Sequence, residues 1–263
     1  MSMENSAEKA VRLTLLEGHV ALVELCRPEV RNAVNSELAR QLEEAVEATE
    51  QSANVRVVVL AGQGDMFCSG ADLKIVSAGG LDTLFTGKGG FAGFNHAVRS
   101  KPWIAAVNGF AVAGGCEMAL ACDMIVAAED AAFALPEVAR GLIASAGGLY
   151  RLPRAIPRNV AIELIATGGR LPAVRAHALG MVNRLAPAKE AVPAALALAA
   201  EITANAPIAV QESLTVARLA FDQDERDLRR LGDEAQQRVM STDDFQEGPR
   251  AFVEKRPARW NGR

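Results

Sequence analysis

The residues best suited to acid–base chemistry in this 263-residue sequence are two glutamates twenty positions apart. Glu117 is the only Asp, Glu, His, Lys or Arg between Ile104 and Cys122, in a stretch rich in apolar residues and glycine. Burial among such residues disfavours a charged carboxylate and raises its pKa. Glu137 directly follows a proline, Pro136. Such a pair can do two tasks together, one group activating water and the other managing a proton on carbon.

Each glutamate also has a simpler interpretation when it is considered alone. Glu117 fits the first turn of a helix that begins near Gly114, where the helix dipole favours an acidic side chain that points to solvent. Glu137, after its proline, fits the exposed first turn of another helix. Perturbed carboxylates mark functional sites only as a tendency. Both interpretations stay open for each residue, and the pair carries more weight than either member.

Two glycine-containing turns offer backbone amides to a negatively charged oxygen. Gly114 and Gly115 open a helix, whose first N–H groups have no partner within it, and glycine lets a ligand approach closely. Tight packing of the backbone is the alternative explanation for this glycine pair. The segment Ser69–Lys74 places Ala71 in a second turn, whose amide can serve the same oxygen. An ordinary strand-to-helix connection, with Asp72 near the helix start, is the alternative there.

The elements that must position these residues alternate between strand and helix over the first two thirds of the chain. A helix is predicted for Ser36–Gln51, with Ser36 as its N-cap. The glycine-rich segment Ser77–Gly93 shows no regular pattern and is typical of a lid beside a pocket. The predicted strands are Val11–Leu16, Val20–Cys26, Val55–Ala61, Met66–Cys68, Ile104–Val107, Met124–Ala127 and Val182–Leu185.

The last third of the chain is helical and rich in alanine. Helices are predicted for Ala191–Ala204, Ile208–Phe221 and Asp224–Met240. The change in period predicts an α/β fold with two regions, a core at residues 1–195 and a helical region at residues 196–263.

The composition disfavours several classes of function. A formal net charge of −4 without a long basic run argues against a nucleic-acid partner. The four cysteines form no CxxC pair and the three histidines are far apart, so neither a metal site nor a disulfide framework is predicted. Residues 103–122 are apolar, but they include Asn108 and Glu117 and are interpreted as buried core, so no membrane partner is expected. The first ten residues show no signal peptide or presequence, which predicts a cytoplasmic protein.

Several short strings stand in a fixed order between about residue 11 and residue 256. The strings are Arg27-Pro28 with Asn32-Ala33, Cys68 to Lys74, Ala105 to Gly109, Gly114 to Glu117, Leu135-Pro136-Glu137, Ala146-Gly147-Gly148 and Phe252 to Arg256. Each string is weak alone, but in their order and spacing they resemble the crotonase, or enoyl-CoA hydratase, family, and the chain is identified as a member of it.

The resemblance implies a spiral of strand–strand–helix units and a coenzyme A thioester as the substrate. It implies that the amides of Ala71 and Gly114 bind the thioester oxygen. It also implies that Glu117 and Glu137 lie on opposite sides of a water that adds across C2 and C3 of the acyl chain. One such preorganised amide donor is typically worth about 10²–10³ in rate. No cofactor is expected, because coenzyme A is part of the substrate.

The same resemblance implies further contacts and an assembly. The residues expected beside coenzyme A are Ala71, Asp72, Leu73 and Lys74. Of these, Lys74 is expected near the entrance. Phe252 and Lys255 are expected to reach the nucleotide bound by a neighbouring subunit. The family also implies a homotrimer or a dimer of trimers, with residues 196–263 as the oligomerisation region.

Two features bear on the choice of substrate. Many hydratases have Pro-Gly where this chain has Ala144-Ser145, so Ser145 is expected to influence water placement or substrate choice. Several segments resemble the carnitinyl-CoA dehydratase branch of the family more closely than a generic member. They are Gly89 to Gly93, Phe133 to Glu137, Arg151-Leu152-Pro153, Glu247-Gly248-Pro249 and Trp260 to Arg263. A trimethylammonium group needs an aromatic or acidic pocket, and with aromatic residues at 5% of the chain none is assigned.

Other functions fit the sequence less well. Relatives in the family isomerise or hydrolyse thioesters, but the presence of both glutamates favours hydration. A non-catalytic acyl-CoA-binding protein is an alternative from another class, because a fold alone does not decide function. The chain has no GxGxxG after a strand and no GxSxG elbow, which disfavours a dinucleotide-dependent dehydrogenase and a serine hydrolase of that type.

Overall fold

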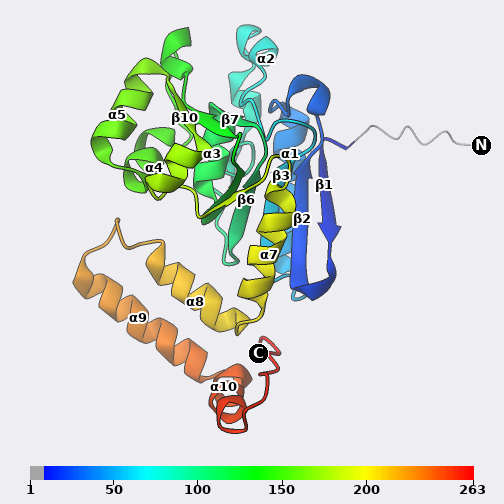
Figure 1. Cartoon of the computed structure of the whole chain (residues 1–263), viewed down its shortest axis with the longest axis vertical. Coiled ribbons are helices and arrows are strands. Elements are labelled where there is room, and N and C mark those ends of the chain that lie inside the picture. The colour runs from blue at the N-terminus through cyan, green and yellow to red at the C-terminus, as the bar shows by residue number, and fades with distance from the viewer. Residues whose placement is uncertain (1–8) are drawn as a thin grey trace, which may run out of the picture.

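The centre of the fold is a six-stranded sheet with the strand order β1-β2-β3-β6-β8-β11 (Figure 1). The computed structural model describes residues 9–263. β1 and β2 pair antiparallel, and all the other neighbours pair parallel. β3 and β6 are buried along almost their whole length, as parallel strands covered on both faces are. The strands are β1 (Val11–Leu15), β2 (Val20–Leu25), β3 (Val57–Gly62), β6 (Trp103–Val107), β8 (Met124–Ala128) and β11 (Arg184–Ala186).

A second sheet has three short strands in the order β10-β9-β7. Its strands are β7 (Phe110–Val112), β9 (Ala132–Ala134) and β10 (Arg170–Pro172). β6 continues into β7 and then into helix α3 (Gly114–Ala121), and β8 continues into β9 and then into the short 3-10 helix η4 (Glu137–Arg140). This is the strand–strand–helix repeat that the family resemblance implies, so the predicted α/β spiral is confirmed.

The pairing of β7 with β9 brings the starts of α3 and η4 together. The two strands run parallel, and the last residue of β7, Val112, pairs with the last residue of β9, Ala134. Paired strands that end in register deliver their following segments to the same place. The first turns of α3 and η4, which carry Glu117 and Glu137, therefore begin next to each other.

Helices cover the central sheet, and the remaining ones extend from it. α1 is Ser36–Gln51 as predicted, but its N-cap is Asn35, whose Oδ1 accepts the N–H of Leu38 at 2.8 Å. The predicted cap, Ser36, is the first helical residue instead. α7 (Ala191–Thr203) packs on β3, β6 and β8. The other α-helices are α2 (Leu73–Ser77), α4 (Gly148–Ala155), α5 (Arg158–Thr167), α6 (Ala173–Ala178), α8 (Pro207–Ala217), α9 (Glu225–Met240) and α10 (Asp243–Val253).

The glycine-rich segment has regular structure, so the expectation of an irregular segment is wrong, whereas its role as a lid stays a prediction. It contains the 3-10 helix η3 (Leu81–Leu84) and a hairpin of β4 (Phe85–Thr86) and β5 (Gly90–Phe91). Leu84 and Phe91 are buried and anchor the segment on the core, and Phe94 beyond it is buried as well. Apolar residues between the glycines thus fix a segment whose glycine content alone indicates an irregular loop.

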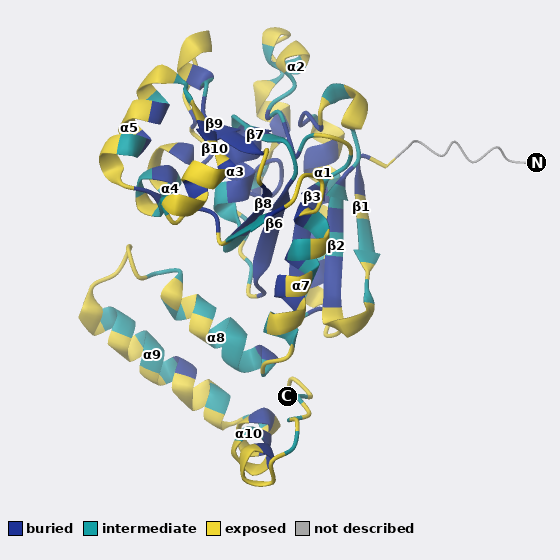
Figure 2. Ribbon diagram, viewed as in Figure 1, coloured by how far each residue is buried: buried dark blue, intermediate teal, exposed yellow. Residues whose placement is uncertain are grey.

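Helices α8, α9 and α10 form an arm that extends away from the two sheets (Figure 1). α8 and α9 pack on each other. In α8 and α9, Pro207 and Ala235 are the buried residues among those described, and Figure 2 shows half-buried and exposed positions along both helices. The predicted division between residues 195 and 196 falls within α7 and stays a prediction.

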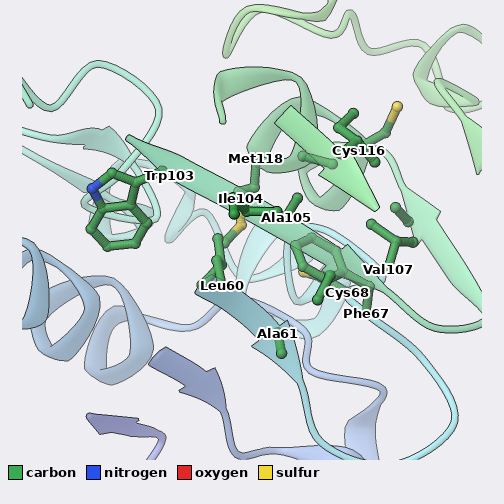
Figure 3. Packing of buried hydrophobic residues seen from close by; sticks show 14 of the residues in the cluster. Leu60, Ala61, Phe67, Cys68, Trp103, Ile104, Ala105, Val107, Cys116 and Met118 are labelled. Atoms are coloured by element: carbon green, nitrogen blue, oxygen red, sulfur yellow. The ribbon is translucent and has the colours of Figure 1, made fainter. Parts of the chain in front are cut away.

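The buried core is one cluster that extends over both sheets and includes residues of α1, α3 and α7. Leu60 of β3, Trp103 and Ile104 of β6, and Met118 of α3 belong to it and are fully buried (Figure 3). Residues 103–122 therefore lie in the protein core, as predicted. Among residues 9–263, no single helix has the length and apolar composition of a membrane span, and α7 with α8 meets that test only as a pair bent by 107°. The prediction that the first ten residues contain no signal peptide or presequence concerns mainly residues 1–8, which lie outside the described residues.

Candidate active site

One large cavity, of about 1440 Å³, gathers most of the residues that the sequence singles out. It lies at the ends of β7 and β9, against α2, α3, η3 and η4. Eight predicted site residues line it, namely Ala71, Asp72, Leu73, Lys74, Gly114, Glu117, Glu137 and Ser145. The two glutamates and the two turns thus share one cavity although they come from separate segments of the chain.

Glu117 is buried at the base of this cavity, with 3% of its surface exposed. The solvent-facing interpretation of this residue is therefore wrong. Its Oε1 accepts a hydrogen bond of 2.9 Å from the backbone N–H of Gly148. Burial raises the pKa of Glu117 to about 7, the nearby Glu137 carboxylate adds to the rise, and the Gly148 N–H opposes it. A carboxyl with such a pKa can exchange protons near neutral pH.

Glu137 is the first residue of η4 and is also buried, with 9% of its surface exposed. The interpretation of Glu137 as an exposed residue in the first turn of a helix is therefore wrong as well. Burial raises the pKa of Glu137, and its Oε2 has no hydrogen-bond partner within residues 9–263. A buried carboxyl oxygen without a protein partner is costly unless a ligand or water completes it. Glu137 lines the cavity, so this oxygen is available to a molecule bound there.

The amide of Ala71 is oriented by hydrogen bonds on both of its neighbours. The carbonyl of Gly70 accepts the N–H of Val34 at 2.8 Å, and the N–H of Asp72 donates to the carbonyl of Val34 at 3.0 Å. Successive peptide groups of an extended chain point in opposite directions. The Ala71 N–H therefore points away from Val34, and it has no acceptor within the described chain.

The amide of Gly114 lies against the same turn. A Cβ added to Gly70 would lie 2.9 Å from the Gly114 nitrogen, so the two turns touch and require glycine at that contact. Gly114 begins α3, and its N–H has no acceptor in the part of the chain that the structure describes. Ala113 before it has a φ of 51°, a strained value for alanine that is fixed by its 2.9 Å hydrogen bond to the Ala134 carbonyl. Such strain costs of order 1–3 kcal/mol and clusters at functional turns.

The apolar wall of the cavity escaped the sequence analysis. It is formed by Val76, Leu81, Phe85, Phe91, Leu142 and Ile143. The rings of Phe85 and Phe91 meet edge to face with centroids 5.5 Å apart. The ring of Phe91 also touches Gly114, because a Cβ on Gly114 would lie 2.4 Å from its Cε1. For Leu81, Phe85 and Phe91, the sequence signal was their position as apolar residues among the glycines of residues 77–93.

Two predicted contact residues lie away from the cavity. Phe252 belongs to α10 and Lys255 follows it, and neither lines the cavity. Figure 1 shows α10 at the far end of the arm from α2, and the side chain of Phe252 is 86% exposed. Their expected contact is with the nucleotide of a neighbouring subunit, and it stays a prediction.

The residues present do not form a metal centre within the described chain. No group of three or more His, Cys, Asp or Glu side chains suited to a metal ion occurs in residues 9–263. The four cysteines are free thiols.

Comparison with known proteins identifies the family. The model of the family described as "Enoyl-CoA hydratase/isomerase" matches residues 16–263. Carnitinyl-CoA dehydratase of Proteus mirabilis is 36% identical over 252 residues, which cover 94% of this chain and 96% of that protein. YngF of Bacillus subtilis, described as a putative enoyl-CoA hydratase/isomerase, is 37% identical and covers 96% of this chain and 98% of its own length.

Solved structures agree with the sequence matches. Enoyl-CoA hydratase from Mycobacterium tuberculosis superposes with a TM-score of 0.93 at 41% identity, covering 97% of this chain and 100% of that chain. Carnitinyl-CoA hydratase from Mycobacterium avium superposes with a TM-score of 0.75 at 42% identity, covering 97% and 99%. The matches span nearly the whole chain, and they confirm the resemblance that the sequence motifs carry. The chain belongs to the enoyl-CoA hydratase/isomerase, or crotonase, family.

Proposed function

We propose that this protein catalyses the reversible addition of water across the C2–C3 double bond of an acyl chain held as a coenzyme A thioester. The observation that carries the proposal is the meeting, in one cavity, of two buried glutamates and two backbone amides that have no acceptor within residues 9–263. Relatives at 36–42% identity named as carnitinyl-CoA dehydratase or as enoyl-CoA or carnitinyl-CoA hydratases support the same reaction type.

The amides of Ala71 and Gly114 bind the thioester oxygen in this proposal. When water adds at C3, the electron pair of the double bond moves toward that oxygen and negative charge develops on it. Two N–H groups that are already oriented stabilise this charge without reorganisation, and each is worth about 10²–10³ in rate.

Glu117 and Glu137 transfer the protons. One carboxylate takes a proton from water as the oxygen attacks C3, and the other carboxyl group gives a proton to C2, so the hydrated product carries one H and one OH more than the substrate. Both groups are buried in the same cavity, where like charges disfavour joint ionisation. The raised pKa values of both groups let the pair share one proton near neutral pH, which is the protonation state that the reaction requires. No cofactor takes part, since coenzyme A belongs to the substrate.

The coenzyme A moiety is proposed to lie along the turn that contains Ala71, Asp72, Leu73 and Lys74. Asp72 is neutralised by Arg27, with 3.6 Å between Arg27 Nη2 and Asp72 Oδ2. Lys74 lines the cavity on the exposed helix α2, where it can meet a phosphate. Ser145 lines the cavity from the loop after η4, which supports a role for its hydroxyl in water placement or substrate choice.

The assembly is proposed to be a homotrimer or a dimer of trimers. Most residues of α8 and α9 in this arm are half-buried or exposed in the single chain, and contact with another copy would cover them. In such an assembly Phe252 and Lys255 would reach a neighbour's nucleotide. Sedimentation velocity measures the oligomeric state, and a monomer at micromolar concentration would contradict this proposal. The cytoplasmic location and the absence of nucleic-acid and membrane partners stay predictions.

Two other functions remain as alternatives to hydration. Isomerisation or thioester hydrolysis would use the same amides, and a non-catalytic acyl-CoA-binding protein would use the same cavity. The experiment that separates them follows the absorbance of the conjugated thioester when purified protein meets crotonyl-CoA, with crotonobetainyl-CoA in parallel and products analysed by mass. A product heavier by one water supports hydration, and the faster substrate identifies the branch. Isomerised or hydrolysed product alone, or binding without turnover, would reject the proposal.

A further inference from the structure

Two side chains from outside the proposed catalytic pair hold the turn that contacts Glu117. Asn95, which is 1% exposed, donates from Nδ2 to the carbonyl of Ala146 at 2.9 Å. Arg151 of α4 donates from Nη1 to the same carbonyl at 3.2 Å. This single carbonyl oxygen therefore has two donors, one from the segment after β5 and one from α4.

The guanidinium of Arg151 joins the two partners to each other. Its Nη2 donates to the backbone carbonyl of Asn95 at 2.6 Å, so one planar group bridges the segment after β5 and the turn before α4. The arrangement depends on glycine at position 147, which has a φ of 127° and where a Cβ would lie 2.0 Å from Arg151 Nη1. The backbone is therefore shaped to admit this guanidinium.

The turn ends at the residue that contacts the candidate catalytic carboxylate. Gly148 follows Ala146 by two residues, and its N–H donates to Glu117 Oε1 at 2.9 Å. Fixing the Ala146 carbonyl fixes the peptide planes that follow it, and hence the direction of the Gly148 N–H. We propose that Asn95 and Arg151 are positioning residues for Glu117, which orient its carboxylate through the Ala146–Gly148 turn. The proposal rests on the role of Glu117 in the proposed hydratase reaction.

Arg151 also acts on Glu117 through its charge. The charged or titratable groups that face Glu117 are Glu137 from η4, which raises the pKa of Glu117, and Arg151 from α4, which lowers it. Loss of the Gly148 hydrogen bond and loss of the Arg151 charge both disfavour the carboxylate, so both raise this pKa. Arg151→Lys keeps the charge but replaces the two nitrogens that donate to the Ala146 and Asn95 carbonyls by a single one, so it cannot hold both carbonyls in the same geometry. The pair of substitutions Arg151→Lys and Arg151→Gln therefore separates orientation from charge.

The test compares Asn95→Ala, Arg151→Lys and Arg151→Gln with Arg154→Gln, a control on the same helix whose side chain instead pairs with Asp222. Hydration of crotonyl-CoA is measured from pH 5 to pH 9. In Asn95→Ala and Arg151→Lys, kcat is expected to fall by about 10- to 100-fold, because a misplacement of about 1 Å costs that much, while KM changes by less than about threefold. The alkaline limb of the pH profile is expected to move to higher pH in all three variants, and furthest in Arg151→Gln, which also loses the charge.

A second readout needs no turnover. Each variant is combined with Glu117→Gln, and the difference in Tm within each pair is followed against pH. This difference reports the ionisation of Glu117 in the folded protein. It is expected to develop at higher pH in Asn95→Ala, Arg151→Lys and Arg151→Gln than in the Arg154→Gln background, and at the highest pH in Arg151→Gln. An Asn95→Ala protein that fails to fold leaves the two Arg151 variants to decide.

The outcomes for the two proposals differ. If the wild type hydrates crotonyl-CoA and Glu117→Gln does not, but all three variants match Arg154→Gln in kcat and in the pH at which Glu117 ionises, the positioning role is wrong. If the wild type adds no water to either substrate, the proposed function is wrong. In that event the Tm difference still decides whether Asn95 and Arg151 control Glu117.

Discussion

The backbone N–H of Gly148 donates a 2.9 Å hydrogen bond to Oε1 of Glu117, which lies 31 residues earlier in the sequence. The start of α4 thus anchors a carboxylate that α3 carries. The contact opposes the rise in pKa that burial causes, because it stabilises the charged form of the carboxyl group. The hydrogen bond therefore fixes the orientation of the Glu117 carboxylate. It also limits the rise in its pKa, which stays near 7, a value that suits proton transfer at neutral pH.

Glu117→Gln and Glu137→Gln are each expected to lower kcat by at least about 10²-fold, the contribution typical of one general acid or base. Glutamine keeps the shape of the side chain but cannot take up or release a proton in this way. Binding of a non-reactive acyl-CoA is expected to change by less than about threefold, measured by calorimetry. Unchanged turnover in either variant would remove that residue from the mechanism.

The rate of hydration is expected to follow a bell-shaped curve against pH. The reaction needs one proton on the glutamate pair, so activity falls on the acid side when a second proton binds. It falls on the alkaline side, at an apparent pKa of about 7 or above, when the last proton leaves. Steady-state kcat measured between pH 5 and pH 9 tests this shape. A flat profile across that range would mean that neither glutamate titrates there in the enzyme–substrate complex, which would contradict this expectation.

Glu117→Gln is expected to stabilise the protein at pH 8 but not at pH 4. The pKa of Glu117 is about 7 in the folded state against 4.5 for an ordinary glutamate. The folded state therefore binds this proton more tightly, and the ionised group costs stability that appears as the pH rises from 4.5 and is complete above 7. The gain at pH 8 is at most about 3 kcal/mol. Urea unfolding at both pH values measures it, with the exposed Glu163→Gln as control.

Gly114→Ala is expected to lower kcat/KM by about tenfold or more while leaving the amide in place. The new Cβ would lie 2.4 Å from Cε1 of Phe91, so either the Phe91 ring or the Gly114 N–H must move, and small displacements of an oriented group are costly in rate. Gly232→Ala in α9 is the matched control, because a Cβ there meets nothing within 4 Å. That control is expected to retain activity and to gain about 0.5–1 kcal/mol in stability. Equal activity in both variants would show that the Gly114 contact is not needed.

Lys255→Ala is expected to raise KM for a coenzyme A thioester by about three- to tenfold, with kcat unchanged. Loss of one exposed ion pair with a phosphate is worth roughly 1 kcal/mol. The same variant is expected to leave KM unchanged for a pantetheine thioester, which lacks the nucleotide. Lys9→Ala, at another exposed lysine, serves as control. A rise in KM for both kinds of substrate would contradict a contact with the nucleotide.

The amino-acid sequence by itself determined the family, the α/β class and the identity of the candidate groups. Glu117 stands out because it is alone among apolar residues, and the Gly114 and Ala71 turns stand out because glycine permits close backbone approach. These are local signals. The sequence also predicted α1 and all six strands of the central sheet, since those elements carry apolar patterns. It missed β7, β9, β10 and the hairpin of β4 and β5, which are too short to show a period. The strand predicted for Met66–Cys68 is wrong, because only Cys68 pairs there, in an isolated bridge with Ala111.

Only the tertiary structure decided how these groups meet. The pairing of Val112 with Ala134 brings Glu117 and Glu137 into one cavity, and no local pattern specifies that register. The contact of Gly148 with Glu117 and the support of Ala146 by Asn95 join segments 31 and 51 residues apart in sequence. Such hydrogen bonds depend on tertiary packing, because the chain between partners 31 or 51 residues apart must fold before donor and acceptor can meet. The sequence therefore names the proton-transfer groups, whereas the fold sets their burial, orientation and pKa.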